Sequence, residues 1–346
     1  MIIFMDSFDH YHPAIGHGAQ KGWLSSIDQI SWDPGKARTG VGCVDLESGG
    51  HGPRRIIGPR VKILVGVACY VGYAGVNAIL LQFWSSNGTG FPSYTVKVLA
   101  DQSIAFYNNT DTFLVVKSVA NVVPVGRYFY LEAKIDMTGF AEIRIDGVVM
   151  CSFTGNFIFP GGQPANIQYF ELDGAGGSNV TRYDDLYILD WSVGPNDDYL
   201  APANSTEGVA IEVFMPVANG AVLEWTPLSG SVPNFAEVNE VPPDDDLSYN
   251  FDGNVGDIDN YIFQPNVPIN TVIFGAQFNF DARLDNPIGS RSVQPNVNGV
   301  GQPQGSEALS IDYVIYPTPF DTNPHTGVAF VPGDFPSTEF GPEVIA

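Results

Sequence analysis

The sequence predicts an all-β protein of two domains, and three observations lead to this prediction. The 346 residues include 38 Gly and 26 Pro, and the hydrophobic residues occur in short runs between turn residues, a composition typical of many short strands. No window of about twelve residues free of Gly and Pro shows the i, i+3, i+4, i+7 spacing of an amphipathic helix. One hydrophobic core rarely grows beyond about 250 residues, so we expect two.

The first domain is predicted to consist of antiparallel strands with one face toward a core. The apolar run 61–84 is interrupted by glycines and is expected to form two buried strands. Residues 94–109 alternate and turn once, and residues 127–153 alternate apolar and polar side chains over three strands. Asp146 and Gly147 predict a two-residue hairpin within the latter segment. A sheet with one dry face must pack on another, so we expect a β-sandwich.

A segment rich in Gly, Pro, Asn, Asp and Ser at 192–208 predicts the domain boundary. We therefore expect one domain at 1–197 and an acidic, β-rich domain at 198–346. Its strands are expected at 209–217, 221–228, 270–284 and 309–317, and its polar loops at 241–261 and 286–306. The last 30 residues contain six prolines. Because proline cannot donate to a sheet ladder, we expect an extended C-terminal strap rather than a central strand.

The net charge of -23 is concentrated in the second domain. Residues 1–200 contain 13 basic and 19 acidic residues, whereas residues 201–346 contain 2 and 19. Such an acidic surface repels nucleic acid and anionic membranes, so neither is expected as a partner. Cations, basic protein surfaces and neutral glycans remain possible, and the alternative is that the charge serves solubility alone.

The remaining composition points to no secretion signal and no disulfides. The N-terminus lacks the basic region of a signal peptide, and no apolar run approaches the ~20 residues of a membrane helix. Cys43, Cys69 and Cys151 stand among apolar residues without CxxC spacing, so we expect buried free thiols.

Two groups of aspartates are candidate Ca2+ ligands, because Ca2+ prefers carboxylate and carbonyl oxygens. Asp184 and Asp185 are adjacent at the start of an apolar run, and Asp244, Asp246 and Asp252 belong to an acidic segment. The alternative for the pair is that adjacent strand residues point to opposite faces, so the carboxylates diverge. The acidic segment lacks the ligand pattern of an EF-hand, and the alternative there is a solvated loop.

The sequence contains no familiar catalytic pattern. The segment from Glu142 to Asp146 does not match the Glu, apolar, Asp, apolar, apolar, Glu pattern of jelly-roll glucanases. G-x-S-x-G, a P-loop and a cysteine with a histidine partner are also missing. We therefore predict that the chain is not an enzyme and has no catalytic residues. The histidines are interpreted as surface-loop residues, with a metal site at the first three as the alternative: His10, His12, His17, His51 and His325.

Two tryptophans are candidates for glycan binding, because sugars stack on exposed aromatic rings. Trp23 and Trp32 lie in loop-like stretches and are predicted to be exposed. Trp84 and Trp225 lie in strand-like runs, where packing in the core is the expectation.

Several segments, taken in order, resemble structural proteins of tailed bacteriophages that contain a concanavalin A-like, laminin-G-type jelly-roll domain. In the first domain they are "FMDSFDHY", "ARTGVGCVDLESGG", "GRYFYLEAKIDM", "FAEIRIDGVVMCSFTG" and "YDDLYILD". In the second they are "EVFMPVANGAVLEWTPLSG", "NFAEVNEVPPDDDLSY", "DTNPHTGVAF" and "EFGPEV".

The resemblance implies a concanavalin A-like jelly-roll sandwich in the first domain, with Asp184 and Asp185 at the entry of its closing strand. It implies a non-enzymatic structural or decoration protein of a virion, on the tail or capsid exterior and made in the bacterial host cytoplasm. The expected partners are other virion proteins and further copies in a homo-oligomer, with a host surface glycan as a possible ligand. The alternative function is a glycan-binding adhesin or lectin of the same class.

Overall fold

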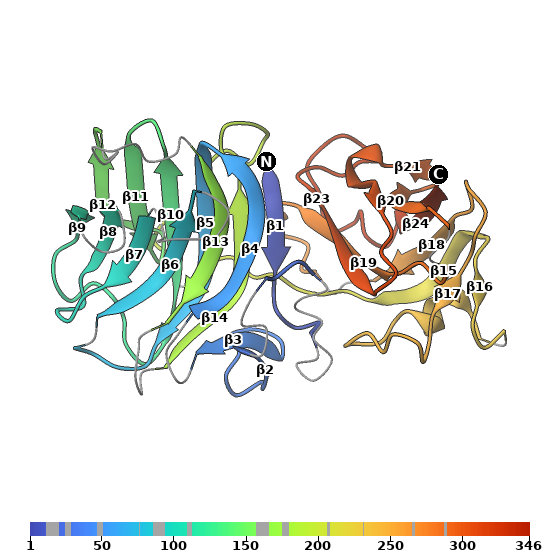
Figure 1. Ribbon diagram of the computed structural model, residues 1–346, viewed down its shortest axis with the longest axis horizontal. Helices are drawn as coiled ribbons and strands as arrows, with labels where there is room; N and C mark the ends of the chain where they lie inside the picture. The colour runs from blue at the N-terminus through green and yellow to red at the C-terminus, as the bar shows by residue number, and fades with distance from the viewer. Residues whose placement is uncertain are drawn as a thin grey trace. The chain divides into compact units, whose positions relative to one another are not determined.

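The computed structural model is almost entirely β-structure. It describes all residues except 12–20, 25–28, 47–50, 76, 86–93, 109–112, 157–165, 175–179, 206–207, 231, 265–266 and 287–288. The described chain divides into two compact units, of which the first holds residues 1–9 and 13–212 and the second holds residues 10–12 and 213–346. Each unit is built from antiparallel strands (Figure 1), so the all-β prediction is confirmed.

The first unit is a jelly-roll β-sandwich of two sheets. An eight-stranded sheet has the order β12-β11-β10-β5-β14-β3-β2, with β1 also paired to β14, and a six-stranded sheet has the order β4-β13-β6-β7-β8-β9. Figure 1 shows the six-stranded sheet in front of the larger one. The strands are β1 (Ile2–Asp6), β2 (Ile30–Trp32), β3 (Gly42–Leu46), β4 (His51–Arg60), β5 (Lys62–Val71), β6 (Ala78–Trp84), β7 (Tyr94–Val98), β8 (Ile104–Asn108), β9 (Phe113–Lys117), β10 (Tyr128–Asp136), β11 (Phe140–Ile145), β12 (Val148–Thr154), β13 (Ile167–Asp173) and β14 (Thr181–Leu189).

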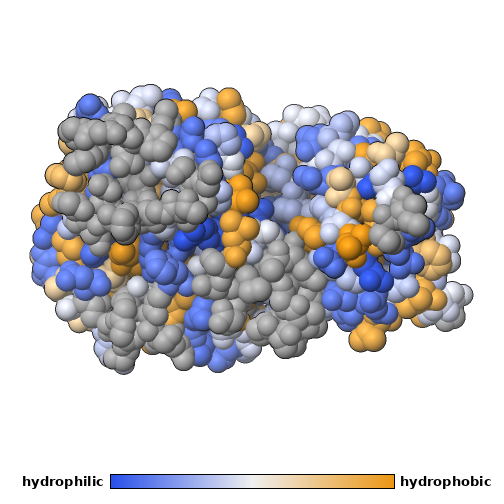
Figure 2. Space-filling model, in the orientation of Figure 1, coloured by the Kyte–Doolittle hydropathy of each residue, from blue (hydrophilic) through white to orange (hydrophobic). Residues whose placement is uncertain are grey.

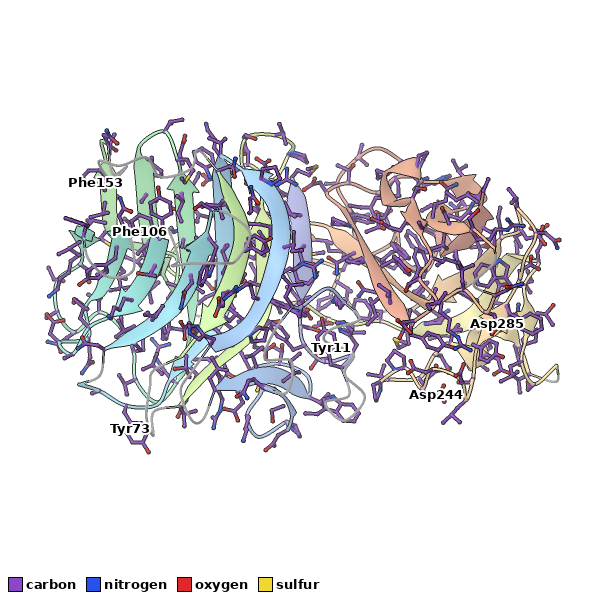
Figure 3. All side chains as sticks on the ribbon, in the orientation of Figure 1. Tyr11, Tyr73, Phe106, Phe153, Asp244 and Asp285 are labelled. Carbon is purple, nitrogen blue, oxygen red and sulfur yellow. The ribbon has the colours of Figure 1, made fainter. Side chains whose placement is uncertain are left out.

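The core of this unit lies between the two sheets. Phe83 and Phe170 pack at 5.8 Å between ring centroids, and the Phe106 ring stacks on Tyr94 at 5.7 Å (Figure 3). These side chains are fully buried, and burying an aromatic or aliphatic side chain of this size contributes about 1.5–3 kcal/mol each. The apolar residues that alternate with polar ones in the sequence are therefore those that pack between the two sheets.

The strand predictions for the first unit are confirmed in detail. The apolar run 61–84 forms β5 and β6, which belong to different sheets. Residues 127–153 cover β10, β11 and most of β12, which pair consecutively. Asp146 and Gly147 form the turn between β11 and β12, both with positive φ. Cys43, Cys69 and Cys151 are free and buried as expected, and burial raises the pKa of the Cys43 and Cys151 thiols to about 12.

Residues 198–212, which the sequence analysis assigned to the second domain, lie with the first unit. The backbone N–H of Ala201 donates to the buried carboxylate of Glu132 at 3.1 Å, and the N–H of Leu200 donates to the Tyr187 hydroxyl. The N–H of Ile211 donates to Asp185 at 2.7 Å. Side-chain acceptors of the eight-stranded sheet thus fix this irregular segment.

The described part of the second unit contains one larger sheet and two two-stranded sheets, β16-β17 and β19-β23. The larger sheet has the order β15-β18-β24-β20-β21, with β22 also paired to β20. Its core includes Val297, Phe320, Phe330 and Phe340. The elements are β15 (Pro216–Leu223), β16 (Thr226–Pro227), η2 (Asn234–Glu237), β17 (Asn250–Phe251), β18 (Asp259–Phe263), β19 (Ala276–Ala282), β20 (Ser292–Val297), β21 (Val300–Gly301), η3 (Pro303–Gly305), β22 (Glu307–Ala308), β23 (Val314–Phe320) and β24 (Glu339–Ile345).

Three strands of this sheet lie partly or wholly in segments that were predicted as polar loops. β18 begins inside 241–261, and β20 and β21 lie inside 286–306. β18 and β20 carry buried amides, and Asn260 donates to Asn296 across the sheet at 3.2 Å. Asn296 in turn donates to Glu343 at 3.0 Å. Because the side-chain amides of both residues donate to polar partners within the sheet, the strands are buried without the apolar alternation by which a strand is recognised.

The predicted C-terminal strap is corrected by the structure at its end. β24 lies between β18 and β20, in the interior of the sheet. Its Pro342 faces Pro295 of β20, so this position exchanges no hydrogen bond, while in an antiparallel ladder the positions on either side do. A central strand therefore tolerates proline here because the two prolines form a non-hydrogen-bonded pair, at which the β20–β24 ladder needs no N–H donor.

Among the described residues, no helix is long and apolar enough to cross a membrane.

Candidate functional site

Asp184 and Asp185 both point into the same loop, contrary to the expectation that adjacent strand residues diverge. The pairing of β14 with β5 is irregular between Asp184 and Tyr187, and Asp185 has a φ of 49°. This left-handed residue breaks the strand alternation. Both carboxylates are fully buried.

Protein donors surround all four oxygens of this aspartate pair. Asp184 accepts hydrogen bonds from the backbone N–H groups of Arg38, Thr39 and Asp185 at 2.8–3.1 Å. Asp185 accepts from the Arg38 guanidinium at 2.6 Å, from the Thr39 hydroxyl at 3.1 Å and from the N–H of Ile211. The pair therefore ties the segment before β3 and the segment after β14 to the sheet. A Ca2+ ion at this pair remains a prediction.

Burial is the main cause of the raised pKa values of Asp184 and Asp185. Burial and the neighbouring carboxylate raise the pKa of Asp184 to about 8. Burial also raises the pKa of Asp185, to about 6, against the opposing effect of Arg38. Because the two groups interact strongly, we describe them as a unit that retains a proton above the range of ordinary carboxylates.

We expect the stability of the first unit to fall as the pH rises from about 4 to about 8. The folded pair keeps a proton that the unfolded chain, with pKa values near 3.8, has already lost. Urea unfolding at a series of pH values measures this slope. Asp184→Asn should make the slope shallower without abolishing it, because burial also raises the pKa of Asp9 and Glu132. An unchanged slope in Asp184→Asn would contradict the assignment.

The aspartates of the predicted acidic loop serve separate partners. Asp244, labelled in Figure 3, accepts from the backbone and hydroxyl of Ser248. Asp246 pairs with Arg283 at 2.7 Å, and Asp252 accepts the N–H of Asn254. Among the described residues, these three are not part of a group of three potential metal ligands. Their Ca2+ binding remains a prediction.

The structure separates the two tryptophans that were predicted as glycan-stacking platforms. Trp23 is 2% exposed, its Nε1 donates to Asp6 at 3.0 Å and its ring packs against Phe4 and Phe8. Its predicted exposure is wrong, because the loop-like sequence around it folds into the core. Trp32 is 39% exposed on β2 and remains a candidate.

A polar row crosses the outer face of the six-stranded sheet, the face turned away from the sandwich core. Register places Arg54 of β4 opposite Glu171 of β13, which lies opposite Gln82 of β6. The row continues through Thr95 of β7 to Tyr107 of β8. Between the grey areas of this face in Figure 2, hydrophilic residues are visible beside smaller hydrophobic patches. Buried polar residues in consecutive strands mark this face as the candidate functional site.

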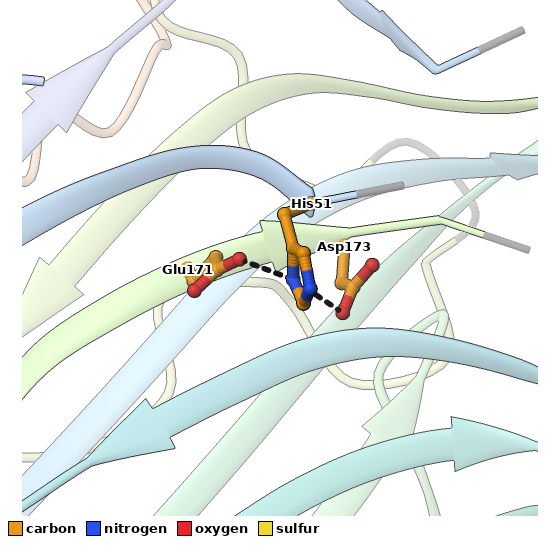
Figure 4. Close-up of side chains that lie close together, drawn as sticks. All are labelled: His51, Glu171 and Asp173. Atoms are coloured by element: carbon orange, nitrogen blue, oxygen red, sulfur yellow. Dashed lines mark ion pairs between the residues drawn. The ribbon is translucent and has the colours of Figure 1, made fainter. Parts of the chain in front are cut away.

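One end of the row contains a cluster of charged side chains. His51 of β4 is opposite Asp173 of β13, and Glu171 lies two residues before Asp173, on the same face. The Nδ1 atom of His51 is 2.9 Å from Oε1 of Glu171 and 3.7 Å from Oδ2 of Asp173 (Figure 4). The Arg54 guanidinium donates to Oε2 of Glu171 at 2.8 Å and lies 4.2 Å from the centroid of the Trp84 ring.

Three polar atoms in or beside this cluster are buried and make no hydrogen bond to any residue that the structure describes. They are Oε1 of Gln82, Nε1 of Trp84 and Oε1 of Glu171. These three side chains are 2%, 6% and 0% exposed, respectively. An unsatisfied buried group of this kind costs about 1–3 kcal/mol, so native structures seldom leave several together.

The cluster has groups that acid–base chemistry and ligand binding both use. The ligand atoms of His51, Glu171 and Asp173 all lie within 4.8 Å of one another, and paired carboxylates or a histidine serve as general acids and bases. Residues 171–173 carry the Glu, apolar, Asp part of the glucanase pattern that is missing at 142–146. The third acid of the glucanase pattern is absent there, and His51 comes from a distant segment.

No protein-family model matches the chain, and no curated protein sequence matches it. Solved structures do show similarity in fold. The cellulose induced protein Cip1 is 15% identical with a TM-score of 0.43, covering 54% of this chain and 97% of that one. Trypanosoma rangeli sialidase in complex with sialic acid is 8% identical with a TM-score of 0.34, covering 43% of this chain and 25% of that one. Sheep galectin-11 is 10% identical with a TM-score of 0.30, covering 41% and 98%.

These similarities concern the fold alone. The prediction that the chain is not an enzyme is contradicted, because a sialidase is among the structures that match. The absence of a familiar carboxylate pattern is therefore no ground for excluding catalysis. No match supports the resemblance to phage structural proteins. The virion location, the virion partners and the homo-oligomer remain predictions.

Proposed function

We propose that this chain binds a carbohydrate on the outer face of its six-stranded sheet. The observation that supports the proposal is the set of three unpartnered polar atoms on Gln82, Trp84 and Glu171. Trp84 Nε1 can only donate, whereas the two oxygens can accept. A sugar hydroxyl both donates and accepts, so a polyhydroxylated ligand that displaces the atoms now covering these groups would offer partners of both kinds.

The extent of the polar row suits an extended ligand. From Arg54 to Tyr107 it crosses five strands, which at the usual strand spacing amounts to about 19 Å. That length exceeds a single sugar ring. Partly exposed aromatic rings of Tyr107 and Tyr169 lie on the same face and offer apolar surfaces for the ring faces of a saccharide.

Trp84→Phe is expected to weaken glycan binding about tenfold. The change removes the indole N–H while keeping an aromatic side chain, and one hydrogen bond of about 1–1.5 kcal/mol corresponds to roughly tenfold in affinity. A screen of bacterial surface and plant polysaccharides identifies a ligand, and titration calorimetry compares the variants. Because catalysis is not excluded, each polysaccharide bound is also examined for cleavage products.

Trp32→Phe is the matched control, since Trp32 lies on β2 of the other sheet. Loss of binding in Trp32→Phe together with unchanged binding in Trp84→Phe would move the site to the surface predicted from sequence. A wild-type chain that binds no glycan in the screen would refute the proposal. Display on a phage particle, where a host surface glycan is the expected ligand, is a separate prediction that immunogold labelling of particles tests.

A further inference from the structure

We propose that His51, Glu171 and Asp173 together bind one divalent transition-metal ion such as Zn2+. This site shares Glu171 with the proposed carbohydrate surface, but it does not depend on carbohydrate binding, because metal binding can be measured without any glycan.

The sheet brings the three side chains together by register. His51 and Asp173 are cross-strand partners on β4 and β13, and Glu171 precedes Asp173 by two residues, with an irregularity in the pairing between these two positions. Side chains two apart on one strand share a face, and cross-strand partners have Cβ atoms about 5 Å apart. Figure 4 shows the three side chains converging from the two strands. Backbone pairing, rather than a flexible loop, therefore positions the donors.

The spacing of the donor atoms fits a metal ion. Donors at about 2.0–2.1 Å from a tetrahedral Zn2+ lie about 3.3 Å from one another. The His51 Nδ1 atom is 2.9 Å from Glu171 Oε1 and 3.7 Å from Asp173 Oδ2. These two separations bracket the tetrahedral value, so small side-chain rotations suffice to coordinate an ion.

One donor is a buried oxygen that the protein leaves without a hydrogen bond. Among the described residues, Oε1 of Glu171 accepts no hydrogen bond although the side chain is 0% exposed, and its charged neighbour is Nδ1 of His51 at 2.9 Å. Two nitrogens of Arg54 contact the other oxygen, Oε2. Arg54 thus holds the Glu171 carboxylate through one oxygen, and the other oxygen faces His51. An ion pair with Arg54 alone would not require this second oxygen to be buried toward His51.

Neighbouring residues orient the ligands as outer-shell groups do in metal sites. Arg54 fixes Glu171, and the Gln82 amide donates to Oδ2 of Asp173. The N–H of Gly174 donates to the other Asp173 oxygen at 2.7 Å. Hydrogen bonds to ligating carboxylates are a regular feature of protein metal sites.

The donor set favours a transition metal over Ca2+. Imidazole nitrogen suits Zn2+ and its neighbours, whereas Ca2+ takes oxygen ligands. Two carboxylates and the Arg54 guanidinium leave one net negative charge to compensate the ion. The His51 side chain is 68% exposed, which provides a path for entry, and three protein ligands leave coordination positions for a bound molecule.

The test uses the full chain, freed of metal with a chelator that is then removed. Calorimetric titration with Zn2+ is expected to show one equivalent bound, and Co2+ is expected to give visible absorption bands of a protein-bound ion. His51→Ala should weaken Zn2+ binding by more than the about 10–100-fold that outer-shell changes cost. Because His51 is exposed, this variant should fold normally, which a thermal melt without metal verifies.

His325→Ala is the matched control, because His325 is an exposed histidine of the second unit, and it should bind Zn2+ as the wild type does. Asp173→Asn should weaken binding as His51→Ala does. Three outcomes would overturn the proposal: no stoichiometric Zn2+ binding by the wild type, equal binding by His51→Ala, or a preference for Ca2+. Each would leave His51 as a simple ion-pair partner of Glu171.

Discussion

Replacing Asp185 with alanine is expected to lower the free energy of unfolding of the jelly-roll unit by about 3–5 kcal/mol. The carboxylate is fully buried and accepts hydrogen bonds from Arg38, Thr39 and Ile211. Its removal leaves a guanidinium that is 16% exposed without its 2.6 Å partner. It also frees two chain segments, before β3 and after β14, which the side chain holds to the sheet. Urea unfolding at neutral pH measures the loss.

Asp185→Asn separates the effect of charge from the effect of backbone conformation. Asparagine tolerates a positive φ such as the 49° found here, whereas alanine does not. We expect the asparagine variant to retain part of the stability that the alanine variant loses. Asp197→Ala, at an exposed aspartate nearby in the chain, should change stability by less than about 0.5 kcal/mol. Equal stability of Asp185→Ala and the wild type would show that the network contributes nothing net.

Replacing Gly341 with alanine is expected to destabilise the second unit by about 3 kcal/mol or more. Gly341 lies in β24 between two neighbouring strands, and a Cβ there would stand 1.8 Å from the carbonyl oxygen of Asp259. The obstacle is backbone, so β18 and β24 must move apart. That movement also disturbs the Asp259 carboxylate, which accepts from Asn234 and Tyr261. Thermal unfolding compares the variant with the wild type.

Gly253→Ala is the matched control for this prediction. A Cβ at Gly253 meets nothing within 4 Å, and the residue has no positive φ. This substitution should leave stability unchanged or raise it slightly, because alanine reduces the entropy of the unfolded chain. If Gly341→Ala and Gly253→Ala melt alike, the close approach of the two strands would not be present in solution.

The candidate site could be predicted from the sequence only in part. Glu171, Leu172 and Asp173 form a recognisable local pattern, which signals two acids on one strand face. His51 and Gln82 are distant from it in the chain, and only strand pairing brings them to the same place. Trp23 shows the opposite failure: a loop-like sequence around it gave no sign that its ring packs with Phe4 and Phe8.

The all-β class, the strands of the sandwich and the Asp146–Gly147 turn followed from local patterns, because alternation and turn chemistry act between neighbours in the chain. Long-range contacts decided the rest. The irregularity at Asp185 turns two adjacent carboxylates toward one loop, and mutual pairing of buried amides makes strands of β18 and β20. The polar face of the six-stranded sheet likewise depends on register between strands, a quantity that no short segment of sequence contains.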